Sequence, residues 1–219
     1  MARPSAEASR DRVLTADEIR AVWTWLDRDP QTVNADGDPR LIELQQIALK
    51  LRFITAQRGG EVLALRWTDV DLVDGWWTIP AEVSKNKLPH RVPLSAMAID
   101  LLGKLLQAAP KKAVHVFGGI RGTRHRRGAL EGLDVADIRP HDFRRTAASL
   151  MTAGGIPRLT VAKILNHVDC SVTAVYDRHG YDAEKRQALD WWGMKLAATI
   201  DGTSGRLLPF TAEGAWLRG

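Results

Sequence analysis

Two basic side chains, His141 and Arg144, stand three residues apart in the segment PHDFRR. On a helix this spacing places them on neighbouring turns of one side. A guanidinium offers a rigid fork of donors that matches a phosphate group, and an imidazole can donate or accept a proton. The pair is therefore a candidate site for a phosphate oxyanion. A solvated basic face with a capping histidine is the alternative, and for this pair alone it is the better interpretation.

A second candidate lies in TAQRGGE, where Arg58 precedes two glycines and Glu61. Glycines let the backbone approach a ligand closely, and Glu61 could hold the Arg58 guanidinium in place, as orienting groups do around other sites. The alternative is a surface ion pair of little energetic value.

A third candidate is Lys85, in the turn KNKLPH between two β-rich runs, where a lysine could act as a general acid. Most lysines at hairpin tips are solvated charges.

The fourth candidate is His167 in LNH, followed nine residues later by Tyr176. A phenol ordinarily has a pKa of about 10, so a nucleophilic tyrosine needs nearby cations or a base. An amphipathic tyrosine at a helix edge is the common alternative.

Composition limits the classes of protein that can use these residues. The chain of 219 residues carries 31 Lys and Arg against 26 Asp and Glu, a net charge of +5, which favours an anionic partner. Its one cysteine, Cys170, excludes a disulfide framework and a cysteine-rich zinc site. No apolar run approaches the roughly 18–20 residues that span a bilayer, and no GxxxxGK[ST] or HExxH motif is present. We expect a cytoplasmic protein with no cofactor, no metal and no membrane contact.

The elements that must position these residues are mostly helical. Periodicity and end signals predict helices at about 15–28, 41–55, 59–67, 95–109, 141–153, 159–166, 171–176 and 182–200. Residues 76–84 and 91–94 predict a small antiparallel sheet, and 114–117 a further short strand. We predict a loop at residues 30–39. We also predict that Trp191 and Trp192 are core residues. The fold class is therefore mostly α with a small antiparallel β-sheet (α+β).

Each motif is weak alone, but their joint order is not easily accidental. In this order the chain resembles the tyrosine recombinase (phage integrase) family, and prophage and genomic-island integrases in particular. The matching stretches are TAQRGGEVLALRWTDVDL, IPAEVSKNKLPHRVPLS, RPHDFRRTAASLMTAGG and KILNHVDCSVTAVYDRHGY. The resemblance covers most of residues 13 to 195 and implies the DNA breaking-rejoining fold of the family's catalytic domain.

The resemblance also implies a role for each candidate. Arg58 and Arg144 would clamp the scissile phosphate, and His167 would donate to a non-bridging oxygen. His141 would assist proton movement at the nucleophile. Lys85 would protonate the departing 5′-oxygen, and Tyr176 would attack phosphorus to form a 3′-phosphotyrosine link. Tyr181 lies five residues too late and is treated as structural. This chemistry conserves the ester bond, so it needs neither ATP nor a metal ion.

Further basic residues are candidates for contact with the DNA backbone. They are Lys87, Arg91 and Arg145, together with Arg121, Arg124, Arg126 and Arg127 in the basic loop RGTRHRR. A solvated loop is the alternative for the last four. The implied partners are a double-stranded DNA attachment site and other protomers, as a tetramer on DNA.

The domain organisation follows from the same resemblance. Residues 1–12 are expected to be a linker or the tail of a missing N-terminal core-binding domain, residues 13–200 the catalytic domain, and residues 201–219 a C-terminal tail. Ala56 stands where many relatives have glycine, a departure expected to be tolerated. Two other functions stay open: a non-catalytic DNA-binding remnant of an integrase, and relaxation of DNA like that of a type IB topoisomerase. Integrase-like spacing favours the recombinase.

Overall fold

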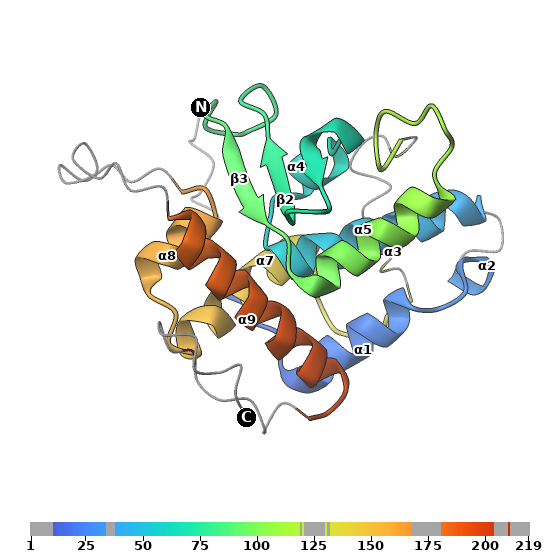
Figure 1. Cartoon of the computed structure of the whole chain (residues 1–219). Helices are drawn as coiled ribbons and strands as arrows, with labels where there is room; N and C mark the ends of the chain where they lie inside the picture. Colours follow the sequence, from blue (N-terminus) through green and yellow to red (C-terminus); the bar gives the residue numbers. More distant parts are fainter. Residues whose placement is uncertain are drawn as a thin grey trace, which may run out of the picture.

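The computed structural model describes residues 11–33, 38–118, 120, 130, 132–167, 181–203 and 210. Within these ranges the elements are α1 (Ala16–Leu26), α2 (Pro30–Val33), α3 (Pro39–Thr55), α4 (Gly59–Leu63), a 3-10 turn (Trp67–Asp69), β1 (Val70–Asp71), β2 (Trp76–Ile79), β3 (His90–Pro93), α5 (Ala96–Ala108), α7 (Pro140–Ala153), α8 (Arg158–Ile164) and α9 (Asp182–Ile200). The predicted fold class, mostly α with a small antiparallel sheet, is confirmed (Figure 1).

Helix α3 is the centre of the fold. It contacts α1, α2, α4, α5, α7 and α9, so most of its side chains are buried, as expected of a helix surrounded by others. Asp38 caps its first turn by accepting a hydrogen bond from the Arg40 amide at 2.9 Å, and Pro39 occupies the first helical position. The helix ends at Ala56, whose backbone is left-handed (φ 56°).

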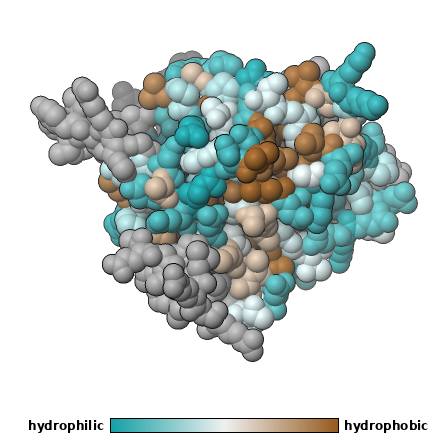
Figure 2. Space-filling view, in the orientation of Figure 1, coloured by the Kyte–Doolittle hydropathy of each residue, from teal (hydrophilic) through white to brown (hydrophobic). Residues whose placement is uncertain are grey.

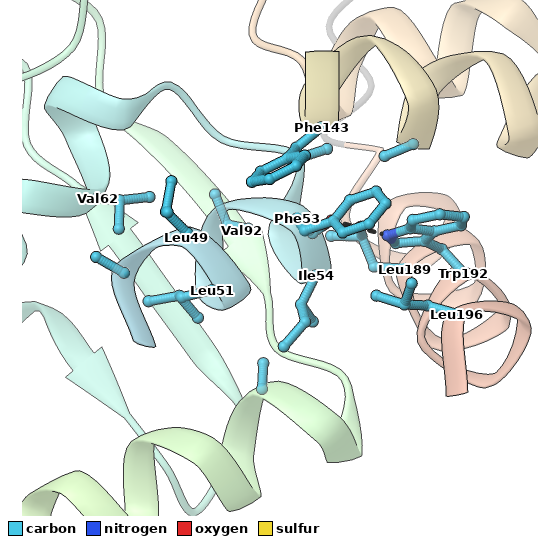
Figure 3. Close-up of a cluster of buried hydrophobic side chains, with 14 of the residues drawn as sticks. Leu49, Leu51, Phe53, Ile54, Val62, Val92, Phe143, Leu189, Trp192 and Leu196 are labelled. Atoms are coloured by element: carbon cyan, nitrogen blue, oxygen red, sulfur yellow. Dashed lines mark hydrogen bonds between the residues drawn. The ribbon is translucent and has the colours of Figure 1, made fainter. Parts of the chain in front are cut away.

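An aromatic cluster joins α3 to α7 and α9. Phe53 stacks on Phe143 with ring centroids 5.1 Å apart and lies 5.6 Å from the ring of Trp192 (Figure 3). The Trp192 indole N–H donates to the Phe53 carbonyl at 3.0 Å, which satisfies both groups in the core. Because Phe143 lies one residue before Arg144, this cluster fixes the helix that carries Arg144. Trp191 and Trp192 are both buried, as predicted.

The sheet has the order β1-β2-β3 with antiparallel pairing, and residues 80–89 join its two longer strands. Trp76 pairs with Pro93 and Ile79 with His90. Trp77 and Ile79 point into the core while their neighbours face outward, the alternation of a half-buried strand. Figure 1 shows β2 and β3 above α5, α7 and α9, with α4 beside them, and β3 contacts α9.

Several predicted boundaries were wrong. Residues 114–117 form turns and one isolated bridge, between Arg66 and His115, because β-forming residues without a longer partner do not make a strand. The helix after Gly59 ends at Leu63 rather than near residue 67. The predicted loop 30–39 contains the short helix α2. The helix predicted at 171–176 lies outside the described residues.

The described surface is largely polar. Figure 2 shows hydrophilic side chains over most of the visible face, with smaller hydrophobic areas between them. Among the described residues, no helix has the length and apolar character that crossing a bilayer requires.

Candidate active site

Arg144 lies at the centre of the candidate site. It occupies the first turns of α7 and is only 4% exposed. Its Nη1 donates to the Ala56 carbonyl at 2.6 Å, and its Nη2 donates to the Leu165 carbonyl. One guanidinium thus bridges the ends of α3 and α8, and the left-handed turn at Ala56 aims one of the two carbonyls at it.

Arg58 lies at the start of α4, two residues beyond that turn. Its guanidinium Nη1 donates to Oε1 of Glu61 at 3.2 Å, and its backbone N–H donates to Oε2 at 3.1 Å. Glu61 is buried, at 3% exposed. The predicted contact between these two residues is therefore present, and the carboxylate holds both ends of Arg58.

The two histidines predicted at the site lie beside the arginines. His141 lies in the first turn of α7 and His167 follows α8; both side chains are partly exposed at the surface and partly buried against the cluster. Burial lowers the pKa of His167, and the charges of Arg144 and Arg58 lower it further. Burial also lowers the pKa of His141, with additional contributions from Arg52 and Arg144. Both shifts favour the neutral form of the imidazole.

The positive charges of the cluster are close enough to oppose one another. The pKa of Arg144 is lowered to about 9, mainly by burial and then by the charges of Arg58 and Arg52, which Glu61 partly offsets. A buried cation that neighbouring cations destabilise gains stability when an anion approaches. The arrangement therefore favours the approach of an anion.

Arg52 is a residue that sequence reasoning missed. It lies on α3, is buried, and its Nη2 is 3.4 Å from Nδ1 of His141. The available signal was a basic residue in the interior of a helix that was predicted from its repeated apolar residues. Gln57 and His90 were also missed: Gln57 Nε2 donates to the Ile164 carbonyl at 3.0 Å, and His90 Nε2 lies 3.1 Å from the same oxygen. Their partner is more than seventy residues away, so no local pattern indicates the contact.

Lys85 lies in the loop between β2 and β3, with its side chain exposed. Of the other basic candidates, Lys87 donates through Nζ to the Glu82 carbonyl at 3.4 Å. Arg91 pairs with Asp182 at 2.5 Å and stacks on the Trp76 ring, and the Arg145 guanidinium is 4.0 Å from an Asp142 oxygen. Arg91 is thus engaged with groups of its own chain.

Tyr176 and the basic-loop residues Arg121, Arg124, Arg126 and Arg127 lie outside the described residues. Tyr181 is described: it has a left-handed backbone (φ 52°) immediately before α9, and the Lys163 ammonium lies 4.7 Å from its ring centroid. Among the residues that the structure does describe, no group of acidic, histidine or cysteine side chains could hold a metal ion.

Comparison with known proteins assigns the chain to a family. The sequence model of the phage integrase family matches residues 12–182. The chain belongs to this family. It is 29% identical over 171 residues to the prophage integrase IntZ of Escherichia coli K12, covering 75% of this chain and 42% of that protein. It is 28% identical over 166 residues to the tyrosine recombinase XerC of Xanthomonas axonopodis pv. citri, covering 67% of this chain and 53% of XerC.

The fold is that of solved integrases. The integrase from mycobacterium phage Brujita is similar with a TM-score of 0.62 at 14% identity, over 98% of this chain and 65% of that one. At this identity the likeness establishes the fold, which is that of the tyrosine recombinase catalytic domain. The integrase chain spans about half the length of the two curated relatives described here.

Proposed function

We propose that this chain is the catalytic domain of a site-specific DNA recombinase that cuts and rejoins strands through a 3′-phosphotyrosine intermediate. The observation that carries the proposal is the convergence of Arg58, His141, Arg144 and His167 from three separate segments into one cation-rich cluster. A phosphodiester is an anion, and its transition state carries more negative charge on the non-bridging oxygens. Fixed donors aimed at that charge lower the barrier by about 3–4 kcal/mol each.

Each residue has a role in the proposed reaction. Arg58 and Arg144 clamp the scissile phosphate, and His167 donates to a non-bridging oxygen. The phenol oxygen of Tyr176 attacks phosphorus, with His141 assisting the movement of its proton. The bond from phosphorus to the 5′-oxygen breaks, and Lys85 supplies the proton that this oxygen takes up.

The preorganisation of the cluster supports its proposed role in this chemistry. Arg144 is held by two backbone carbonyls and Arg58 by Glu61, so neither guanidinium must be ordered when the phosphate arrives. The proposed reaction conserves the phosphoester bond, and its steps use only the chain's own side chains and the DNA.

The biological setting that we propose is integration or excision of a prophage or genomic island. Relatives named prophage integrases support it. The expected partners are a double-stranded attachment site and further protomers, as a tetramer on DNA, and the expected location is the bacterial nucleoid. The domain division at residues 12 and 200 remains a proposal, as do DNA contacts by Lys87, Arg91, Arg145 and the basic-loop arginines.

Covalent capture tests the proposal. A pool of nicked duplexes with randomised sequence around the scissile position is incubated with the protein, and adducts that survive denaturation are isolated and sequenced. We expect the wild-type chain to form an adduct and Tyr176→Phe to form none, while Tyr181→Phe, the matched control, retains it. An adduct that survives Tyr176→Phe would reassign the nucleophile. DNA binding without any adduct would instead support the alternative, a non-catalytic DNA-binding remnant.

A further inference from the structure

A closed set of hydrogen bonds joins the loop that carries Lys85 to the turn that carries His167. Asn86 Nδ2 donates to Asn166 Oδ1 at 2.8 Å, and Asn166 Nδ2 donates to Ser84 Oγ at 3.0 Å. Asn166 Nδ2 also lies 3.3 Å from Asn86 Oδ1, and Ser84 Oγ donates to that oxygen at 2.6 Å. We call Ser84, Asn86 and Asn166 the polar clasp.

The clasp fixes the backbone on both sides of Lys85. Ser84 is 1% exposed, and its amide donates to the Pro80 carbonyl at 3.0 Å. The Lys87 amide donates to the Ser84 carbonyl at 3.1 Å, and the Leu88 amide to Asn86 Oδ1 at 3.3 Å. Because both neighbours of Lys85 belong to the clasp, the position of its Cα is set while its side chain projects from the surface.

The other end of the clasp adjoins a segment that is held by hydrogen bonds to its backbone. The carbonyls of Ile164 and Leu165, just before Asn166, accept hydrogen bonds from Gln57 and Arg144 respectively. Asn166 itself has a left-handed backbone (φ 49°), a conformation that glycine and asparagine tolerate best. Asparagine meets the backbone requirement and adds an amide that reaches the Lys85 loop, which glycine would not.

We infer that Asn166 is a positioning residue, which holds the Lys85 loop against the His167 turn so that the lysine ammonium stays within reach of the departing 5′-oxygen. The inference rests on the proposed function. Without the clasp, the exposed lysine would sample a wider range of positions, and the fraction of time that it spends near the leaving group would fall.

The variant Asn166→Gly tests this role with little risk to the fold, because glycine accepts the same backbone conformation. Asn86→Ala removes the clasp from the opposite side. If the clasp orders the loop, amide hydrogen exchange at Lys87 and Leu88 should accelerate in both variants. Exchange in the α3 core should not change.

The chemical readout uses two forms of the captured duplex, one with an ordinary phosphodiester and one with sulfur in place of the bridging 5′-oxygen. A thiolate leaves without being protonated, so the sulfur substrate does not need the general acid. General acids contribute about 10²–10⁴-fold. We therefore expect Lys85→Ala to slow adduct formation on the oxygen substrate by at least about 100-fold, and Asn166→Gly by about 10-fold. Both variants should approach the wild-type rate on the sulfur substrate.

The outcomes separate the two claims. If wild-type protein forms no adduct on either substrate, the proposed function fails and the positioning role falls with it. If the wild-type protein and Asn166→Gly form the adduct equally fast on the oxygen substrate, the inference is overturned while the proposed function stands. If Asn166→Gly slows adduct formation equally on the oxygen and the sulfur substrates, the inference is also overturned. The defect would then lie in phosphate binding rather than in the position of the lysine.

Discussion

The Nη1 atom of Arg144 donates a hydrogen bond to the carbonyl oxygen of Ala56 at 2.6 Å, across 88 residues of sequence. Its Nη2 atom reaches the Leu165 carbonyl in the same way. The guanidinium therefore acts as a bracket between two helix ends as well as a candidate phosphate ligand. A lysine has one donor centre and cannot make both contacts in this geometry.

Replacing Arg144 should separate cleavage from binding. We expect Arg144→Ala and Arg144→Lys each to slow adduct formation by at least about 100-fold, because a preorganised donor to the phosphate is lost. DNA affinity should fall only slightly, since many phosphate contacts share the binding. Rates of adduct formation and a filter-binding isotherm on the same duplex measure the two effects. A parallel collapse of affinity would make Arg144 mainly a docking residue.

Ala56 should tolerate only a small residue. Its left-handed backbone disfavours side chains and disfavours β-branched ones most. We expect Ala56→Val to lower the free energy of unfolding by about 2 kcal/mol or more, through backbone strain and overpacking. Ala56→Gly should change it by less than about 1 kcal/mol, because relief of strain offsets the lost methyl group. Urea unfolding measures both; equal effects of the two variants would contradict the explanation.

His90 should make stability depend on pH. Burial lowers its pKa to about 4, with the charge of Lys185 the next contribution, whereas an unfolded histidine titrates near 6.5. The unfolded chain thus binds more protons between these values, so the contribution of His90 is complete above about pH 6.5 and is lost as the pH falls toward 4. The expected loss is about 3 kcal/mol. Histidines 141 and 167 shift in the same direction.

The variant His90→Gln isolates this contribution, because an amide can still donate to the Ile164 carbonyl but does not titrate. The free energy of unfolding, measured from pH 7 to pH 4, should fall less steeply in the variant than in the wild-type protein. Identical slopes would assign the acid sensitivity to other groups.

Two tryptophans should differ in how much stability is lost on replacement by phenylalanine. The Trp192 indole N–H is buried and bonded to the Phe53 carbonyl. Trp192→Phe should cost about 2–4 kcal/mol of stability, from the lost volume and the unsatisfied carbonyl. The Trp67 indole nitrogen is buried without a hydrogen-bond partner among the described residues. Trp67→Phe should therefore cost less than about 1 kcal/mol or stabilise the fold. Chemical unfolding compares them directly.

Local signals predicted much of the helical framework. The helix predicted at about 15–28 is α1, which begins with a capping box of Thr15 and Glu18, and the span predicted at 182–200 is that of α9. The error at residues 114–117 arose because strand formation depends on a partner strand that composition does not reveal. Helix α2 was missed because proline, glycine, asparagine and aspartate near it favour a loop.

The candidate site was predictable where its residues form a recurring pattern, as for Arg58, His141 and Arg144. Glu61, which holds Arg58, was predictable as well, but other residues around the site were not. Arg52, Gln57 and His90 act through contacts with distant carbonyls or rings, and such contacts exist only after folding. Asn166 carried a weak local signal, since an asparagine just after a helix often adopts a left-handed backbone.

Among the described residues, the Glu61 carboxylate opposes the effect of the Arg52 and Arg58 charges on Arg144, and it does so only in part. Folding this domain therefore brings together like charges whose repulsion an incoming anion relieves. By thermodynamic linkage, whatever neutralises the site also raises the melting temperature. Under the proposed function, the DNA phosphate that enters this site is therefore also a ligand that stabilises the folded state.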